Sequence, residues 1–339
     1  MPFGQNRNWQ IIDLAIFMFH FCLLTQFIGT IIMGTDRQKG GICVALSRKQ
    51  FDILEQLVDG PLSQRQIREA TGMSLGTINR TMKELNDAGY VSDGAITGAG
   101  MEALEPYRVR RAVFIAAGFG TRLVPITLNT PKPLVRVNGR RIIDGLLDAC
   151  LAIGIEEIYI VRGYLSEQFD QLLYKYPMIS FLENPIYNEA NNISSALVAR
   201  YLLSNAYVFE ADLLLHNPGI LKKYHYASDF LGFKTARTDD WCFRVKDNTI
   251  VEEMVGGEGP DIWQMVGISY WNGADGKKLS TDIAEVYATP GGKERYWEQV
   301  PLVYAKAHYS VELRECSAQD VTEIDTFREL KAIDKIYDV

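Results

Sequence analysis

The chain has 339 residues, which is room for two or three domains that each bury a core, and a single small module is excluded. Hydrophobic residues make up 47% and charged residues 23%, as in soluble globular proteins, so bulk disorder is excluded as well. Lys and Arg number 35 against 42 Asp and Glu, and the net charge of −7 argues against polyanion binding as the main task. The five cysteines form neither a C-x-x-C pair nor a metal-ligand spacing, which favours buried thiols in a reducing cytoplasm.

The first segment, residues 1–45, is dominated by a hydrophobic stretch. Between Ile11 and Met33, 17 of 23 residues are apolar, enough to span a bilayer, but Asp13 inside it is costly there. Three interpretations stay open: a membrane anchor, a helix that packs on a partner, and a start assigned too early. The segment Gly34–Gly41 has no helix or strand pattern that would join this stretch to the next domain, which slightly favours the third interpretation. Since no cleavage site follows, we expect a cytoplasmic protein, attached to a membrane only if 11–33 is a genuine helix.

The second segment, residues 46–108, has the pattern of a small winged helix-turn-helix domain. Three serines stand at N-cap positions ahead of three short amphipathic helices. Thr71-Gly72-Met73 forms the turn between the second and third helices, and Ser92-Asp93-Gly94 between two short apolar runs predicts a β-hairpin wing. The serines are Ser47, Ser63 and Ser74.

This segment resembles the winged helix-turn-helix domains of bacterial regulators, which leaves open whether it binds DNA. From Ser47 to Pro106 there are six basic and nine acidic residues, the wrong balance for neutralising phosphates. Four basic residues nevertheless fall on the second and third predicted helices, which face the DNA groove in such domains. DNA binding and a role in protein contact or dimerisation therefore stay equal alternatives. The four are Arg65, Arg68, Arg80 and Lys83.

The third segment, residues 109–339, opens with a strand and a phosphate-binding loop. The apolar run from Arg110 to Ala117 predicts a buried parallel strand. Gly118 and Gly120 then free backbone N–H groups to face phosphate oxygens, while Arg122 and Lys132 add two cations. No G-K-[ST] follows and a third glycine is missing, so neither the P-loop nor the dinucleotide fingerprint fits.

Predicted strands and helices alternate beyond the loop, which indicates an α/β fold with a Rossmann-like, mostly parallel sheet covered on both faces. In such a sheet the carboxyl ends of the strands bring Gly118, Gly163-Tyr164 and Asp212 to one edge. The expected helices span residues 142–153, 166–173 and 193–203, and the expected strands span 157–161, 179–182 and 206–210.

Acidic residues at that edge predict a magnesium site. Asp212 ends a strand where a triphosphate would lie, and Mg²⁺ prefers carboxylate and phosphate oxygens together. Near the C-terminus, the two-residue alternation of Thr322-Glu323-Ile324-Asp325 would place both acids on one side. The expected metal ligands are therefore Asp212, Glu323 and Asp325.

The loop residues Ala116 to Leu123 and the P-K-P-L segment at 131–134 resemble the signature of nucleotidyltransferases with a GT-A-like fold. Within that superfamily the chain most resembles the bacterial CTP:phosphocholine cytidylyltransferases. The segments 162–169, 191–195 and Glu323-Ile324-Asp325 match that family, while Glu210 replaces its aspartate in the D-A-D motif. The resemblance implies Arg122 and Lys132 as catalytic residues, and these nucleotide-binding residues: Ala116, Ala117, Gly118, Gly120, Thr121, Gly163, Tyr164, Asn191, Asn192 and Ser194.

Aromatic residues in the second half predict how the acceptor is recognised. A quaternary ammonium donates no hydrogen bond, so aromatic faces would have to bind it. A primary ammonium would instead prefer carboxylates, here Asp239, Asp240 or Glu298. A sugar phosphate fits this set poorly. The expected aromatic contacts are Trp241, Tyr270, Trp271, Tyr296 and Trp297.

These observations predict a Mg²⁺-dependent enzyme that makes CDP-choline and pyrophosphate from CTP and phosphocholine, without a protein nucleophile. One alternative keeps the chemistry but takes 2-aminoethylphosphonate or phosphoethanolamine as the acceptor. Another is a nucleotide-sensing transcriptional regulator that binds DNA through its winged helix. A homodimer stays open.

Overall fold

The computed structural model of the protein describes residues 45–338. The hydrophobic stretch 11–33, with its three interpretations, lies outside the described residues, as do Cys22 and Cys43. Within the described range no helix is both long enough and apolar enough to cross a bilayer. Three cysteines in this range are free and buried, as expected: Cys150, Cys242 and Cys316.

The winged helix-turn-helix forms as predicted. Ser47 and Ser63 close capping boxes, and Gly72 ends the second helix in the left-handed conformation with φ 69°. An additional helix follows the wing, where Gly100 packs so tightly that a Cβ would lie 2.3 Å from the Tyr90 carbonyl oxygen. The elements are α2 (Arg48–Gln56), α3 (Gln64–Thr71), α4 (Leu75–Asp87), β1 (Val91–Ser92), β2 (Ala95–Ile96) and α5 (Gly98–Leu104).

The core of this small domain takes in two tyrosines from the following segment. Phe51 on α2 lies 5.5 Å from the ring of Tyr226, and Tyr224 is buried in the same cluster. Arg48 donates to both carboxylate oxygens of Glu312 at 2.8 Å.

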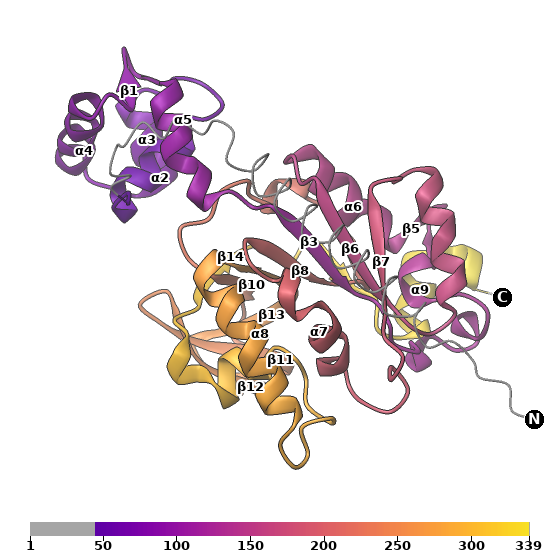
Figure 1. Ribbon diagram of the computed structural model, residues 1–339. Coiled ribbons are helices and arrows are strands. Elements are labelled where there is room, and N and C mark those ends of the chain that lie inside the picture. The colour runs from indigo at the N-terminus through magenta and orange to yellow at the C-terminus, as the bar shows by residue number, and fades with distance from the viewer. Residues whose placement is uncertain (1–44, 339) are drawn as a thin grey trace, which may run out of the picture. The chain divides into compact units, whose positions relative to one another are not determined.

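A nine-stranded mixed sheet organises the remaining residues, in the order β10-β14-β12-β11-β13-β8-β3-β6-β7. The four strands β8, β3, β6 and β7 are parallel, as predicted, and Figure 1 shows them beside α6. Strand β13 joins them antiparallel to β8, with Ile268 opposite Phe209. The parallel part consists of β3 (Arg111–Ile115), β6 (Glu157–Arg162), β7 (Ile179–Glu183) and β8 (Ala206–Glu210).

Both faces of this sheet are covered, because successive strand residues enter different cores. Phe114 of β3 packs against α6, whereas Val113 packs in the cluster that contains residues of α7 and α8. These helices are α6 (Ile142–Ala152), α7 (Ile193–Ala199) and α8 (Gly273–Tyr287). The helix expected at 166–173 is a 3₁₀ helix over Ser166–Tyr174, and the one at 193–203 ends as a short 3₁₀ turn after Ala199.

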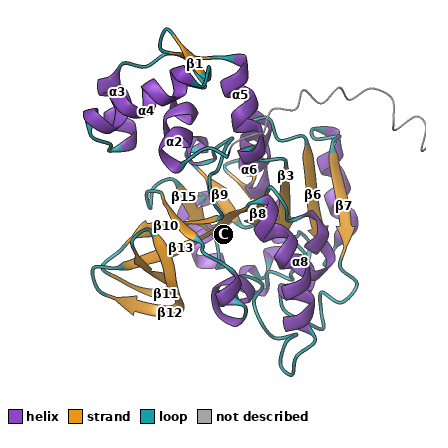
Figure 2. Ribbon diagram, turned by 60° about the vertical axis from the view of Figure 1, so that its left-hand side comes forward, coloured by secondary structure: helices purple, strands orange, loops and turns teal. Residues whose placement is uncertain are grey.

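The second half adds antiparallel strands that the sequence analysis does not place. Figure 2 shows the β11–β12 hairpin set apart from β3, β6 and β7. A separate two-stranded ribbon pairs β9 with β15, with Leu213 opposite Glu323. These strands are β9 (Leu213–Leu215), β10 (Asp229–Lys234), β11 (Arg237–Lys246), β12 (Thr249–Glu258), β13 (Ile262–Trp271), β14 (Glu312–Glu315) and β15 (Val321–Glu323). The predicted α/β fold with an N-terminal winged helix is confirmed.

Candidate active site

A cavity of about 460 Å³ opens at the carboxyl ends of β3 and β8, the edge where the sequence places its candidate residues. Its walls come from the phosphate-binding loop, the end of β8, the start of β11, and the segments around 296 and 323. The residues lining it include Ala116, Gly118, Gly120, Thr121, Arg122, Lys132, Asn192, Glu210, Asp212, Asp240, Trp241, Met265, Tyr296, Glu298, Glu323 and Asp325.

The phosphate-binding loop needs its second glycine for two reasons. Gly120 has φ 62°, and a Cβ there would lie 3.0 Å from the Lys132 Cβ. The hydroxyl of Thr127 donates to the Gly120 carbonyl at 2.8 Å and holds the turn. Glycine thus allows Lys132 to pass close under the loop.

Several predicted nucleotide residues support the loop without lining the cavity. Tyr164 donates through its hydroxyl to the Thr127 carbonyl at 2.9 Å and through its N–H to Ala117 at 3.1 Å. Gly163 leaves space for Tyr187, whose Cγ would lie 2.6 Å from an added Cβ. Ala117, Gly163 and Tyr164 are therefore placed as a scaffold.

The N-N-x-x-S segment divides in the same way. Asn192 lines the cavity. Ser194 is buried and donates to the Asn191 carbonyl at 2.8 Å, and the Asn191 amide donates to the Glu294 carbonyl at 3.1 Å. Asn191 and Ser194 therefore hold Asn192 in place and are not themselves in the cavity wall.

Lys132 lies at the centre of a charge network. Its Nζ donates to Asp212 Oδ2 at 2.7 Å and to Asp325 Oδ1 at 2.9 Å, and Arg122 donates to the other Asp325 oxygen at 2.7 Å. Burial opposes the charge of Lys132, but the Asp212 and Asp325 carboxylates outweigh it and raise its pKa. Lys132 thus faces the cavity in its charged form, and Arg122 lines the same cavity.

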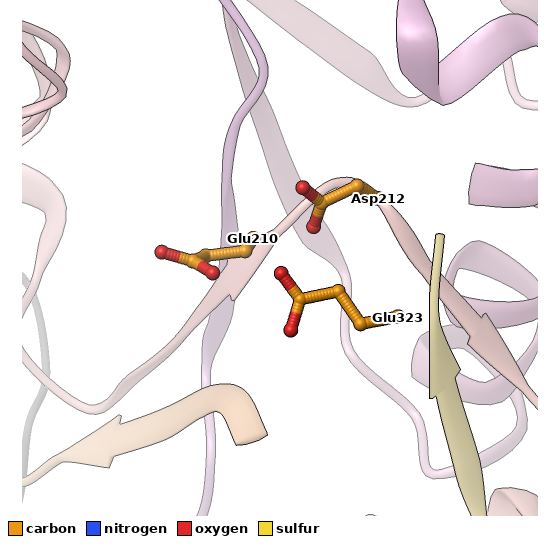
Figure 3. Close-up of side chains that lie close together, drawn as sticks. All are labelled: Glu210, Asp212 and Glu323. Atoms are coloured by element: carbon orange, nitrogen blue, oxygen red, sulfur yellow. The ribbon is translucent and has the colours of Figure 1, made fainter. Parts of the chain in front are cut away.

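Three carboxyl groups converge beside this network (Figure 3). One oxygen from each of Glu210, Asp212 and Glu323 lies within 4.8 Å of the others, and Oδ1 of Asp212 is buried without a hydrogen-bond partner. Burial, then the charges of Asp212 and Glu210, raise the pKa of Glu323 to about 9. Burial and the charge of Glu298 raise that of Glu210 well above its ordinary value. Three converging carboxyl groups, one with an unpartnered oxygen, fit the oxygen-donor set of Mg²⁺.

This cluster differs from the predicted ligand set in one member. Asp212 and Glu323 belong to it, whereas both oxygens of Asp325 accept from Lys132 and Arg122. Glu210 takes the third place. The sequence signal that could have identified Glu210 as a ligand is its two-residue spacing from Asp212 at a strand end, which puts both side chains on one side of the chain.

One end of the cavity combines aromatic rings with carboxyl groups. We call it the acceptor end, because the sequence analysis expects its rings to contact the acceptor. The rings of Trp241 and Tyr296 meet edge to face at 5.3 Å, and Asp240, Met265 and Glu298 line the wall with them. Glu298 is 2% exposed, and its side-chain partner is the Asn192 amide at 3.5 Å. Burial, then the charge of Glu253, raise its pKa to about 8.

Three of the five expected aromatic contacts are core residues instead. Tyr270 and Trp271 are fully buried because each face of β13 is covered: Tyr270 stacks on His225 at 4.1 Å, and Trp271 packs in the opposite core. Trp297 is 2% exposed and lies against Phe230. The expectation that these three rings form an acceptor cage is wrong.

Comparison with known families gives the class of protein to which this fold and site belong. Residues 111–214 match the Nucleotidyl transferase family, and residues 46–95 match the MarR family. The chain belongs to the nucleotidyl transferase family and is an enzyme of its cytidylyltransferase group. It is 36% identical over 229 residues to the 2-aminoethylphosphonate cytidylyltransferase of Lancefieldella rimae, covering 67% of this chain and 92% of that one. It is 30% identical over 227 residues to the choline-phosphate cytidylyltransferase of Streptococcus pneumoniae, covering 67% and 97%.

A solved structure supports this assignment. The CTP:phosphocholine cytidylyltransferase from Streptococcus pneumoniae superposes with a TM-score of 0.61 at 28% identity, over 68% of this chain and 99% of that one. The resemblance to cytidylyltransferases stated from the loop and the E-I-D motif is thereby confirmed.

Proposed function

We propose that the protein is a Mg²⁺-dependent cytidylyltransferase whose acceptor carries a phosphonate or phosphate at one end and a primary ammonium at the other. The acceptor that we propose first is 2-aminoethylphosphonate, and phosphoethanolamine is its near analogue. The observation that carries the proposal is the presence of Glu298 and Asp240 in the cavity wall beside Trp241 and Tyr296. Since the reaction consumes CTP, we place the protein in the cytoplasm.

The acceptor end of the cavity favours a group that can donate hydrogen bonds. A primary ammonium has three donors, whereas a quaternary ammonium has none. The loss of Tyr270, Trp271 and Trp297 to the core leaves two rings, and the buried Glu298 has only a long side-chain hydrogen bond, to Asn192 at 3.5 Å. The relative that is 36% identical and named for 2-aminoethylphosphonate supports the same choice.

The geometry supports an in-line displacement at the α-phosphorus of CTP. An oxygen of the acceptor phosphonate forms the new P–O bond, and the bond to the β-phosphate breaks as pyrophosphate leaves. Arg122 and Lys132 neutralise the charge that develops on the phosphate oxygens, and Asn192 lines the same wall. Glu210, Asp212 and Glu323 would hold Mg²⁺, which supplies Lewis-acid polarisation of the phosphate when bound.

Pyrophosphate release by the purified full chain tests the proposal. CTP, UTP and ATP are each combined with 2-aminoethylphosphonate, phosphoethanolamine, phosphocholine and glucose 1-phosphate in the presence of Mg²⁺. We expect the highest kcat/KM with CTP and 2-aminoethylphosphonate. A clear preference for phosphocholine would contradict the primary-ammonium acceptor, and no turnover with any pair would favour the nucleotide-sensing regulator.

A Glu298→Gln substitution tests the carboxylate directly. We expect the KM for 2-aminoethylphosphonate to rise at least about tenfold, since a buried charged hydrogen bond is worth roughly 1.5–3 kcal/mol, while kcat/KM for phosphocholine changes little. Glu294→Gln, on the same segment but exposed, is the matched control. Equal losses with both acceptors would contradict a role in ammonium recognition.

Phosphocholine is the second candidate acceptor, because Trp241 and Tyr296 present two rings at 5.3 Å in the cavity. A Trp241→Leu variant separates the candidates. If the rings bind a quaternary ammonium, kcat/KM for phosphocholine falls much more than that for 2-aminoethylphosphonate.

For the winged helix we propose DNA as a partner, on the strength of its MarR match and of the exposed face of α4. That face carries Asn79, Arg80 and Lys83 in exposed positions. At low salt, the full chain should shift DNA taken from upstream of its own gene, and the double variant Arg80→Ala/Lys83→Ala should not. Arg136→Ala is the control, and an absent shift with wild-type protein would contradict DNA binding.

A further inference from the structure

Two glutamates at the acceptor end of the cavity, Glu298 and Glu253, have buried carboxyl oxygens and no cation to compensate them. Glu298 lines the cavity, whereas Glu253 of β12 does not, and neither oxygen of Glu253 has a hydrogen-bond partner. Within residues 45–338, no lysine, arginine or histidine forms an ion pair with either group. An isolated buried carboxylate is costly, so such a group takes up a proton or needs a positive ligand.

The fold places Glu253 there through the register of the hairpin. Glu253 is opposite Phe243 of β11, and cross-strand partners share one face of a sheet. Phe243 belongs to the apolar core that also contains Trp297, directly before Glu298 in the chain, and Val300, two residues after it. Glu253 is therefore held in apolar surroundings on the Glu298 side.

The next residue along β12 behaves differently and serves as an internal comparison. Glu252 faces the other way, is 56% exposed at its side chain, and accepts from Arg244 at 3.2 Å. An acidic residue at 252 is thus compensated and solvated, whereas the one at 253 is neither.

The charges around the pair favour its protonated form. Burial, then the Glu253 charge, raise the pKa of Glu298 to about 8, and burial alone raises the pKa of Glu253 to about 7. Glu210 faces the same cavity from β8, and Asn192 is the neutral partner of Glu298. At neutral pH the pair therefore holds at least one proton, which an arriving cation would make less favourable.

We propose that Glu253 is a positioning residue of the acceptor subsite, whose buried carboxyl beside Glu298 makes binding of the acceptor's ammonium group release a proton. This rests on the proposed function. The O–H bond of Glu298 breaks, its proton passes to water, and the resulting carboxylate accepts a hydrogen bond from the ammonium. An acceptor of the same shape without a cationic group gains nothing from this exchange, so the pair selects for positive charge.

Calorimetric titration of 2-aminoethylphosphonate into the full chain tests the proposal, with Mg²⁺ and a CTP analogue carrying a methylene bridge between the α- and β-phosphorus. Repeating it at pH 7 in buffers of different ionisation enthalpy counts the protons released. We expect the wild type to release about one proton more than Glu298→Gln, and Glu253→Gln to lose at least half of that excess. Glu252→Gln should match the wild type.

Steady-state kinetics give a second readout. In Glu253→Gln, the KM for 2-aminoethylphosphonate at pH 7.5, where Glu253 is largely ionised, should fall about 2–3-fold, because the charge that keeps Glu298 protonated is removed, with kcat unchanged within twofold. The pH range over which this KM changes should move to lower pH. Glu253→Met, which is apolar and of similar length, should act in the same direction.

Two outcomes would overturn the inference. An unchanged proton count and an unchanged pH profile of KM in Glu253→Gln, with only the melting temperature altered, would leave Glu253 a purely structural residue. Failure of the proposed function has a different signature: the wild type would turn over no acceptor that carries a primary ammonium group, and the inference would fall with it.

Discussion

Replacing Asp212 with Asn is expected to lower kcat at least about 10³-fold with little change in fold, since one oxygen of the carboxylate serves Lys132 and the other has no partner. The amide keeps the size of the side chain but removes a negative charge from the cluster with Glu210 and Glu323. We therefore expect the Mg²⁺ concentration at half-maximal rate to rise as well. Pyrophosphate release over a range of Mg²⁺ concentrations measures both effects.

The control for this variant is Asp239→Asn. The Asp239 side chain is 92% exposed and lies outside the cavity wall, so its removal should leave kcat within about twofold. If Asp212→Asn kept its rate and its Mg²⁺ dependence, the acidic cluster would not be the metal site.

Replacing Lys132 with Met is expected to reduce kcat/KM for CTP about 10³-fold or more. The side chain is 10% exposed and lies between Asp212 and Asp325, which hold its ammonium group in place to neutralise the reacting phosphates. Its loss also leaves two carboxylates without their ammonium partner. We expect a lower melting temperature at pH 8 that added Mg²⁺ partly restores.

Lys175→Met is the matched control, because Lys175 is half-exposed and pairs with Asp148 away from the cavity. Single-turnover experiments at saturating CTP separate weaker binding from slower chemistry. A Lys132→Met protein with kcat/KM within tenfold of the wild type would show that this lysine does not act on the phosphates.

Local patterns in the sequence predict much of this molecule. Ser47, Ser63 and Ser74 are sufficient to place three helix starts, because a capping hydroxyl acts within one turn of its own chain. The glycine-rich loop likewise predicts a phosphate site, since Gly120 satisfies a backbone requirement that is read from nearby residues. Features of this kind depend on contacts close in sequence.

The residues that pattern analysis misassigned depend on distant contacts. Trp271 has the composition of a ligand-binding ring, yet its environment is decided by α8 and by Trp297, which pack on it from elsewhere in the chain. The residues next to Glu298 in the sequence do not indicate that its side chain is buried. Trp241 and Glu298 reach one wall of the cavity only through the nine-stranded sheet. Its antiparallel strands lie beyond residue 210, where the predicted alternation of strands and helices ends.

The unpaired carboxyl groups around the cavity also govern how the protein should be stored. Acids with a raised pKa in the folded state stabilise the fold at low pH, and that contribution is lost as pH rises from their ordinary value through the raised one. For Glu253, Glu298 and Glu323, raised to about 7, 8 and 9 from 4.5, the free energy of unfolding should decline across this range. The protein alone is therefore least durable in alkaline buffer, and cations that bind only the folded chain extend its shelf life there.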